Sequence, residues 1–288
     1  MGTETQTIDK SQLRRSFQRA AADYDHHARL QQEVGERLLE RVAEIRLTPA
    51  SVLDVGMGTG RCTEVLARRF RNARVAGIDI APAMARLARG RRRLRLYPAP
   101  RYLVADMEAL PLAASSVDLL FSNLSFQWAS DLDILLAELY RVARPGTPLL
   151  FSSFGPDTLR ELRGAWAAVD PGVHVNRFLD MHDVADAMMK AGFTDVVTDV
   201  DRLVEHHPDV MSVMRGLKAI GAHNVDARRR RALTGRRRLE GVLTAYEAHR
   251  SDAGLPVTYE VVYGLGWVVE PTPVMVPMTA FSPPRSRV

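Results

Sequence analysis

Three glycines follow a short apolar run that contains one acid. The run is Val52–Val55, its acid is Asp54, and the glycines stand at alternate positions: Gly56, Gly58 and Gly60. A glycine loop that leads from a strand into a helix lets backbone N–H groups approach a ligand. The spacing G-x-G-x-G departs from the dinucleotide fingerprint G-x-G-x-x-G, because Arg61 stands where the third glycine would be. The carboxylate of Asp54 disfavours a pyrophosphate and favours an ammonium or sulfonium group.

Two further acids are placed as they would be after successive strands. Asp79 comes at the end of a second predicted strand, and Asp106 follows a third. A carboxylate at the second position can accept both hydroxyls of a ribose. One at the third position can accept an adenine amino group. Because the carboxyl ends of parallel strands meet at one edge of a sheet, all three acids are expected at a single ligand site.

Each of these features also has an explanation without a ligand. The glycines can form a tight strand-to-helix turn, Asp79 can cap the helix that follows it, and Asp106 can be a solvated loop acid. Met57 and Met84 are expected in the core, where Met84 can also line an adenine. Cys62 is expected to be a small core residue rather than a nucleophile.

The elements that must position these residues alternate between strands and helices. Apolar runs predict strands at 52–55, 74–79, 102–105 and 117–121 and the start of a fifth at 149–151, with helices at 61–71, 82–93 and 131–142 between them. Such alternation implies right-handed crossovers and a doubly wound α/β fold, in which helices cover both faces of a parallel sheet.

Helical periodicity also precedes and follows this core. Residues 9–46 predict a helix with a break near 25–27, and further helices are expected at 180–191, 209–221 and 226–249. Late strands are expected at 195–204 and 257–263, and the proline-rich residues 271–288 are expected to be disordered. The predicted organisation is an N-terminal helical segment over the site (1–47), a binding core (48–153), and the remaining strands with a helical substrate cap (154–270).

Together the glycine loop and the acids resemble the class I S-adenosylmethionine-dependent methyltransferases over residues 48–152. Residues 54–60 match that family's first motif, Asp79 its ribose-binding acid, and Asp106 its adenine-contacting acid. The turn at 141–146, RVARPG, matches the one before the family's fifth strand. The resemblance implies a seven-stranded, mostly parallel Rossmann-like sheet with S-adenosyl-L-methionine as cofactor. The implied cofactor contacts are Asp54, Gly56, Gly58, Gly60, Asp79, Ile80, Met84, Asp106, Met107 and Asn123.

The stretch after the fourth predicted strand is expected on the acceptor side of the site. Residues 121–128 read FSNLSFQW and lack the Pro-Pro of DNA amino-methyltransferases, which argues against methylation of a nucleic-acid base. Gln127 and Trp128 are expected where they can contact both the sulfonium region and an acceptor. Trp128 can equally be explained by packing under the next helix.

A closer resemblance extends over about residues 10–265. The segments 16–25, 122–128, 175–179, 217–222 and 257–260 resemble the biotin-pathway malonyl-acyl-carrier-protein O-methyltransferases, the BioC family. This resemblance implies methylation of the free carboxylate of malonyl-acyl-carrier protein, or of malonyl-CoA, in biotin precursor synthesis. The acidic acyl carrier protein is then a partner.

Three residues outside the cofactor motifs fit that substrate. Arg177 and Lys218 are candidates for binding the malonyl carboxylate or nearby anionic groups, and Tyr24 is expected to close over the site. Taken alone, Arg177 is better explained by a surface salt bridge and Lys218 by a solvated helix face.

The 288-residue chain carries 39 Lys and Arg against 34 Asp and Glu, a formal net charge of +5. Arginine runs at 89–93, 228–231 and 236–238 suit docking of an acidic carrier, although solvated helix faces explain them equally well. The runs have no interleaved aromatic residues, so no stable nucleic-acid partner is expected. The single cysteine excludes an internal disulfide and a cysteine-rich metal site, and no metal is expected. No apolar segment suggests a membrane span or a secretory signal, so the expected location is the cytoplasm.

Two other functions stay open at this point. The chain can be a methyltransferase for another small molecule, such as a quinone precursor or a small acid. It can also be an assembly protein that keeps the fold and the cofactor site without transferase activity. The intact Asp54, Asp79 and Asp106 weigh against the latter.

Overall fold

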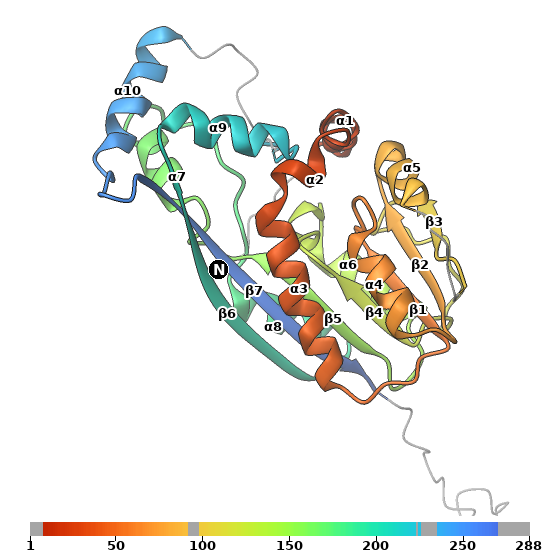
Figure 1. Ribbon diagram of the computed structural model, residues 1–288. Coiled ribbons are helices and arrows are strands. Elements are labelled where there is room, and N and C mark those ends of the chain that lie inside the picture. The colour runs from red at the N-terminus through yellow and green to blue at the C-terminus, as the bar shows by residue number, and fades with distance from the viewer. Residues whose placement is uncertain (1–7, 92–97, 223, 226–234, 270–288) are drawn as a thin grey trace, which may run out of the picture.

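A computed structural model gives the fold and describes residues 8–91, 98–222, 224–225 and 235–269. Within these residues seven strands form one sheet in the order β3-β2-β1-β4-β5-β7-β6 (Figure 1). The strands are β1 Ser51–Val55, β2 Arg74–Asp79, β3 Arg101–Val104, β4 Leu119–Ser122, β5 Pro148–Phe154, β6 Phe193–His207 and β7 Leu255–Val268. Strands β1 to β5 pair in parallel, whereas β7 runs antiparallel to both β5 and β6. The predicted α/β sheet, seven-stranded and mostly parallel, is confirmed.

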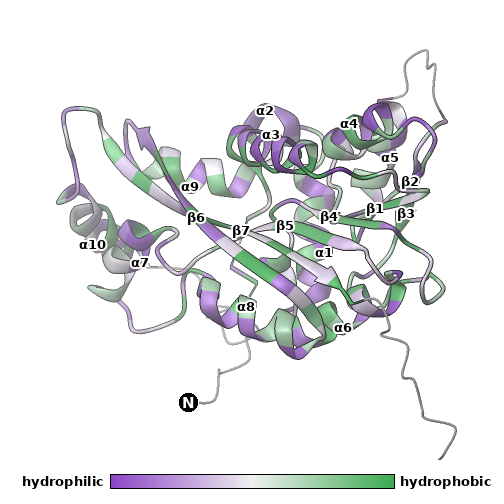
Figure 2. Ribbon diagram, turned by 90° about the horizontal axis from the view of Figure 1, so that it is seen from below, coloured by the Kyte–Doolittle hydropathy of each residue, from purple (hydrophilic) through white to green (hydrophobic). Residues whose placement is uncertain are grey.

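Helices cover both faces of the sheet, as Figure 2 shows. One face carries α3 (Arg29–Glu44), α4 (Arg61–Arg69) and α5 (Pro82–Gly90), and the other carries α6 (Leu132–Val142) and α8 (Met181–Lys190). At the carboxyl edge of the parallel strands lie α1 (Lys10–Ala20), α2 (Tyr24–His27) and α9 (Val210–Ala219). The pair α7 (Arg160–Ala167) and α10 (Arg236–Glu247) packs together next to the long strands. The chain therefore places its N-terminal helices over the edge where a ligand is expected.

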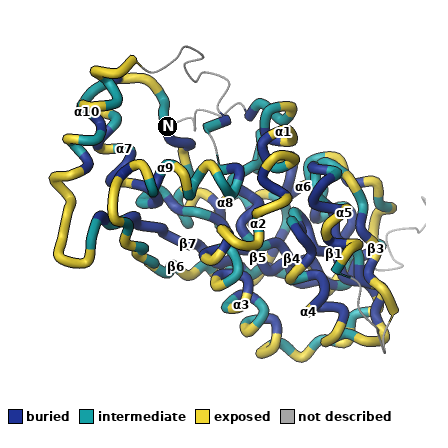
Figure 3. Tube along the Cα trace, turned by 45° about the horizontal axis from the view of Figure 1, so that its top comes forward, coloured by how far each residue is buried: buried dark blue, intermediate teal, exposed yellow. Residues whose placement is uncertain are grey.

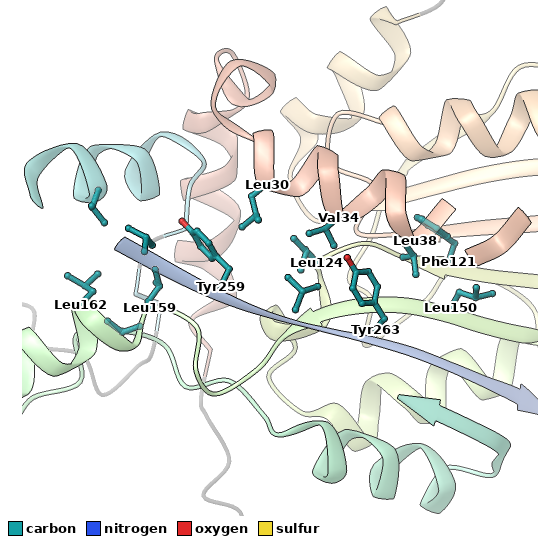
Figure 4. Packing of buried hydrophobic residues seen from close by; sticks show 14 of the residues in the cluster. Leu30, Val34, Leu38, Phe121, Leu124, Leu150, Leu159, Leu162, Tyr259 and Tyr263 are labelled. Atoms are coloured by element: carbon teal, nitrogen blue, oxygen red, sulfur yellow. The ribbon is translucent and has the colours of Figure 1, made fainter. Parts of the chain in front are cut away.

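The sequence of α3 explains why this helix lies on the sheet. Leu30, Val34 and Leu38 recur every four residues and are all buried, which gives the helix one apolar stripe. Figure 4 shows these side chains pointing toward Tyr259 and Tyr263 of β7. Packing of this stripe fixes α3, and with it α2 and α1, relative to the sheet.

The central strands are buried on both faces. All residues of β1 and β4 are buried, as expected where helices cover a parallel sheet, and Figure 3 shows the buried interior beneath exposed helix surfaces. The edge strand β6 instead alternates between more and less exposed residues along most of its length. The loops that follow β1 and β4 thus begin at buried, well-packed strand ends, and this fixes the positions of the loop side chains.

Several predicted boundaries differ from those observed. The predicted helix 9–46 is divided into α1, α2 and α3 by turns at 21–23 and at Ala28, so the predicted break at 25–27 is itself the short helix α2. Strands β6 and β7 are longer than the predicted 195–204 and 257–263, because they pair with each other along most of their length. Of the predicted helix 226–249, residues 236–247 form α10. Residues 226–234 and the tail 271–288 lie outside the described residues.

Candidate active site

A cleft of about 850 Å³ opens at the carboxyl edge of the parallel strands, beneath α1 and α2. Open α/β sheets bind ligands at this edge. The predicted site residues that line the cleft are Tyr24, Gly56, Gly58, Asp79, Ile80, Met84, Asp106, Met107, Asn123, Gln127 and Trp128. The predicted residues that do not line it are Asp54, Gly60, Arg177 and Lys218.

The glycine loop forms the floor of the cleft. The N–H groups of Gly56 and Met57 both donate to the carbonyl oxygen of Ile78 at 2.9 Å, which fastens the loop to β2. Gly56 has φ of 73°, and a Cβ there would lie 2.3 Å from the Cβ of Ser125, so glycine alone fits this position. A Cβ on Gly58 would meet no atom beyond its chain neighbours closer than 4.0 Å, so this part of the loop faces open space.

Asp79 is the acid that faces the cleft. Its two carboxylate oxygens accept the N–H of Gly58 at 3.0 Å and the N–H of Ala81 at 2.8 Å. Burial raises the pKa of Asp79 to about 6, although both N–H groups favour the ionised form. The bonds hold the carboxylate between the glycine loop and α5, and its remaining lone pairs can accept ribose hydroxyls.

Asp54 lies beneath the loop rather than in the cleft. It is 1% exposed and accepts a hydrogen bond from Thr63 Oγ1 at 2.5 Å. Burial, opposed by the bond from Thr63 and reinforced by the charge of Asp79, raises the pKa of Asp54 to about 7. Gly60 is covered as well, because its Cβ position lies 2.7 Å from Ala88. The prediction that Asp54 faces a cationic ligand is therefore corrected: its side chain turns toward α4 and ties that helix to β1.

Asp106 forms an ion pair that the sequence did not indicate. The ammonium group of Lys10 lies 2.6 Å from Asp106 and also pairs with Glu108. Glu108 in turn accepts the N–H of Asp131 at 2.8 Å. Burial lowers the pKa of Lys10, but the bonds to the two acids raise it above its ordinary value. The ion pairs fix the start of α1 to the loop that follows β3.

A second set of bonds ties α2 to the glycine loop. Asp25 accepts a hydrogen bond from Thr59 Oγ1 at 2.7 Å and pairs with Arg91. Arg91 donates to the carbonyl oxygen of Thr59 at 2.6 Å. Burial, together with the charges of Asp79 and Asp25, raises the pKa of Tyr24, so its hydroxyl stays protonated at the cleft. The N-terminal helices are therefore attached to the site at both ends.

The acceptor side of the cleft is held by neutral groups. The Trp128 ring meets Phe17 of α1 edge-to-face, with centroids 5.5 Å apart. Gln127 donates to the carbonyl oxygen of Leu124 at 2.7 Å, and Asn123 donates to that of Gln31 at 2.8 Å. Trp128 thus lines the cleft and packs against α1, not against the following helix as the alternative predicted, and its contact with an acceptor stays a prediction.

Arg177 and Lys218 lie outside the cleft. Arg177 is exposed and lines a neighbouring cavity that shares Gln127 with it, and Lys218 is exposed on α9. Leu217 packs on the core, which leaves Lys218 on the outer face of its helix. The structure does not bring these two cations to the place where an acceptor meets the cofactor.

The described part of the arginine runs is mostly engaged in internal bonds. Arg89 donates to a backbone carbonyl oxygen of β3 at 2.8 Å, while Arg91 holds the glycine loop. Arg236 and Arg238 each pair with an acid. Residues 92–93 and 228–231 of the runs lie outside the described residues. These four arginines thus have partners within the chain, and docking of a carrier through the runs stays a prediction.

Four further residues of the site carry no motif in the sequence: Lys10, Phe17, Gln18 and Asp25. Gln18 closes the set, because its side-chain oxygen accepts the N–H of Ala83 at 3.0 Å, at the start of α5. The one feature of the sequence that could have indicated these four residues is that they lie in the N-terminal helical segment, which was expected over the site. Their partners lie far along the chain, so no local pattern marks these residues.

The described residues give no support for a metal site, a membrane-spanning helix or a reactive cysteine. There, no cluster of three or more His, Cys, Asp or Glu side chains is placed to hold a metal ion. Over the same ranges no helix is both long and apolar enough to cross a membrane. Cys62 faces Gly35 of α3, and burial raises the pKa of its thiol, which leaves it a poor nucleophile as predicted.

Comparison with known proteins agrees with this geometry. A family model described as a methyltransferase domain matches residues 53–151. The malonyl-[acyl-carrier protein] O-methyltransferase of Laribacter hongkongensis is 48% identical over 271 residues, which cover 92% of this chain and 91% of that protein. Its namesake from Halorhodospira halophila is 47% identical over 272 residues, covering 94% and 92%.

Solved structures share the fold at lower identity. The YcgJ protein of Bacillus subtilis has a TM-score of 0.59 and 17% identity, covering 82% of this chain and 98% of that one. A possible histamine N-methyltransferase of Thermotoga maritima has a TM-score of 0.54 and 20% identity, covering 88% and 99%. The chain is therefore an S-adenosylmethionine-dependent methyltransferase that belongs to the malonyl-[acyl-carrier protein] O-methyltransferase family.

Proposed function

We propose that this chain methylates the free carboxylate of a malonyl group carried as a thioester on an acidic acyl carrier protein or on coenzyme A. We place the reaction in biotin precursor synthesis in the cytoplasm. The observation that carries the proposal is the identity of 48% with a relative of that name, across 92% of this chain. The cleft at the carboxyl edge of the sheet, with Asp79 on its wall, supports it.

The residues around the cleft fit S-adenosylmethionine. Asp79 offers a fixed carboxylate to the ribose hydroxyls, and Gly58 leaves open space beside the loop. Ile80 and Met84 give apolar walls, and Asp106 follows β3 where an adenine amino group is expected. When bound, the cofactor supplies a methyl group on a positively charged sulfur, which an acceptor oxygen takes by in-line displacement.

The protein's own contribution is alignment and exclusion of water. A malonyl carboxylate is ionised at pH 7, so no side chain has to remove a proton from it. Trp128 and Phe17 cover the acceptor side, and a site without bulk water strengthens the attraction between a carboxylate and a cationic sulfur. We assign Tyr24 and Gln127 to orienting the acceptor, since both line the cleft and offer neutral polar groups.

The direct test is transfer of a labelled methyl group from S-adenosylmethionine to malonyl-carrier protein by the purified full chain. We expect a base-labile methyl ester on the malonyl group. Acetyl-carrier protein, which lacks the free carboxylate, is the matched control and should stay unlabelled. Transfer to a quinone precursor alone, or cofactor binding without turnover on any acceptor, would contradict the proposal. Rescue of a biotin-requiring strain that lacks its own malonyl methyltransferase repeats the test in cells.

A further inference from the structure

Two further cavities adjoin the cofactor cleft and share lining residues with it. An inner chamber of about 530 Å³ shares Trp128 and Phe154 with the cleft. An access groove of about 1260 Å³, between α2, α9 and the end of β6, shares Tyr259 with the inner chamber. Gln31 and Ile220 line all three cavities. The three spaces are therefore neighbours that share these two lining residues, and the inner chamber lies beside both the groove and the cleft.

The inner chamber suits a slender chain of methylene and amide groups. Its walls are mostly apolar, with Leu159 and Phe178 among them, and the amides of Asn176 and Asn224 lie between these apolar groups. The described residues that line it include no Asp, Glu, Lys or Arg. A charged group is therefore disfavoured along the chamber, whereas an amide-containing arm finds both apolar and polar contacts.

The access groove has a permanent cation at its surface end. Arg29, in the first turn of α3, is exposed and lines the groove together with His26, His27 and His206. Among the described residues none forms an ion pair with Arg29. The acid that lines the groove, Glu205, lies 3.5 Å from a histidine. The groove therefore offers a guanidinium to an anion, while its acid already lies beside His207.

We propose that the malonyl thioester enters through the access groove on a phosphopantetheine arm, with Arg29 binding the phosphate ester and the inner chamber holding the arm. This inference rests on the proposed function, because it assumes that the acceptor is a thioester of such an arm. Carrier protein and coenzyme A share this phosphate chemistry. Arginine binds phosphate through paired N–H donors, which makes it well suited to this role.

The helix next to the groove favours a carrier protein as the owner of the arm. The residues Gly216 and Leu217 of α9 line the groove, and the same helix carries Arg215 and Lys218 and no acid. An acidic carrier that docks over α9 would thus meet positive charge at the point where its arm must enter. This gives the exposed Lys218 a place in recognition of the carrier rather than of the malonyl carboxylate.

The phosphate contact is tested with three acceptors: malonyl-carrier protein, malonyl-CoA and malonyl-pantetheine, which lacks the phosphate. In Arg29→Gln we expect KM to rise about tenfold for the two phosphate-bearing acceptors, with kcat unchanged and with KM for malonyl-pantetheine unchanged. Arg46→Gln is the matched control, because Arg46 is an exposed arginine just beyond the other end of α3. A lower KM for the carrier than for coenzyme A supports the carrier as the source of the arm, and the reverse supports coenzyme A.

The path itself is tested by filling the groove. A Cβ on Gly216 meets no atom within 4 Å, so Gly216→Trp is tolerated by the fold and occupies the groove. We expect KM to rise at least tenfold for all three acceptors, while cofactor affinity measured by calorimetry stays the same. Gly164→Trp on α7, where a Cβ also meets no atom within 4 Å, is the control and should leave KM unchanged.

The outcomes separate this inference from the proposed function. Wild-type protein that methylates none of the three acceptors overturns the proposed function and this inference with it. Wild-type protein that methylates them, with Arg29→Gln acting equally on malonyl-pantetheine, overturns the phosphate site alone. Unchanged KM values in Gly216→Trp overturn the path.

Discussion

Asp79 and Asp54 are two acids near the cleft that differ in how deeply they are buried. Asp79 faces the cleft and is held by two backbone N–H groups, whereas Asp54 is covered by the glycine loop and bonded to Thr63. Burial raises the pKa of both carboxyl groups, because no described cation is bonded to either of them. Asp79, which lines the cleft, favours a positively charged ligand there when it is ionised.

For Asp79 we expect a direct effect on the cofactor. Asp79→Asn should weaken S-adenosylmethionine binding about 10- to 100-fold, because hydrogen bonds from the ribose to a charged acceptor are lost. Since the pKa of Asp79 is about 6, the affinity of the wild-type protein should fall as the pH drops through 6 and the carboxylate is protonated. Calorimetric titration at pH 5 and pH 8 checks both effects, with Asp199→Asn on the exposed face of β6 as control. Equal affinity in Asp79→Asn and wild type would remove the assigned role.

For Asp54 we expect an effect on stability. Folding raises the pKa of Asp54 from 3.8 to about 7, so the native state holds the proton more tightly than the unfolded chain. The free energy of unfolding should therefore fall as the pH rises from about 4 to about 7 and then level off, by roughly 1–3 kcal/mol. Urea unfolding at pH 5 and pH 8 should show a larger loss in wild type than in Asp54→Asn, in which the raised pKa of Asp79 still causes a smaller loss. The same pH dependence in both proteins would contradict the expectation.

At the scale of elements, α1 and α2 act as a strap across the cleft. Lys10 fixes one end to the loop after β3, and Asp25 fixes the other to the glycine loop. Between them Phe17 packs against Trp128, so the strap also covers the acceptor side. These polar ties add to the apolar contacts that Leu13 and Phe17 make with the body of the protein.

The tie through Lys10 has a measurable consequence. In Lys10→Met we expect backbone amides of residues 10–20 to exchange hydrogen about tenfold faster than in wild type, because the start of α1 loses its ion pairs. Hydrogen exchange followed by mass spectrometry on the cofactor-free protein measures this. Arg14→Met, an exposed position on the same helix, is the control and should exchange like wild type. Equal exchange in Lys10→Met and Arg14→Met would show that the ion pairs do not hold the helix.

At the scale of the whole molecule, one sheet joins the cofactor site to the acceptor path. The parallel strands end at the cleft, and β7 joins β5 to the edge strand β6, whose end lines the access groove. The junction between the two parts is tight, because Phe151 of β5 lies opposite Gly264 of β7 and covers it. Packing at this junction thus determines how the groove sits relative to the cleft.

We expect Gly264→Ala to destabilise the protein by about 1–3 kcal/mol, because overpacking forces the surroundings to shift. A Cβ at position 264 would lie 2.2 Å from a ring carbon of Phe151, which itself stacks on Phe126. The matched control is Gly164→Ala in α7, where a Cβ meets no atom within 4 Å. That change should be neutral or stabilise the protein by up to about 1 kcal/mol. Urea unfolding of both variants measures the change in the free energy of unfolding. Equal stability of the two variants would show that Phe151 does not restrict position 264.

The α/β fold, the order of its central elements and the glycine loop could all be predicted from the sequence. These features depend on local patterns: the apolar run before Gly56, the glycine spacing, and acids placed after successive strands. Since parallel strands bring their carboxyl ends to one edge, Asp79 and Asp106 could be placed together without knowing any tertiary contact. The long strands β6 and β7 were predicted too short, because their pairing with each other extends beyond their apolar runs.

The direction of each side chain and its contacts, in contrast, depend on the tertiary packing. Asp54 turns under the loop, and Arg177 and Lys218 lie outside the cleft. The ion pair between Lys10 and Asp106 joins residues that are 96 positions apart, and no local pattern encodes such a pairing. The access groove with Arg29 likewise exists only where α2, α9 and β6 come together. Motifs fix the chemistry that a chain can offer, whereas long-range packing fixes which of those groups meet.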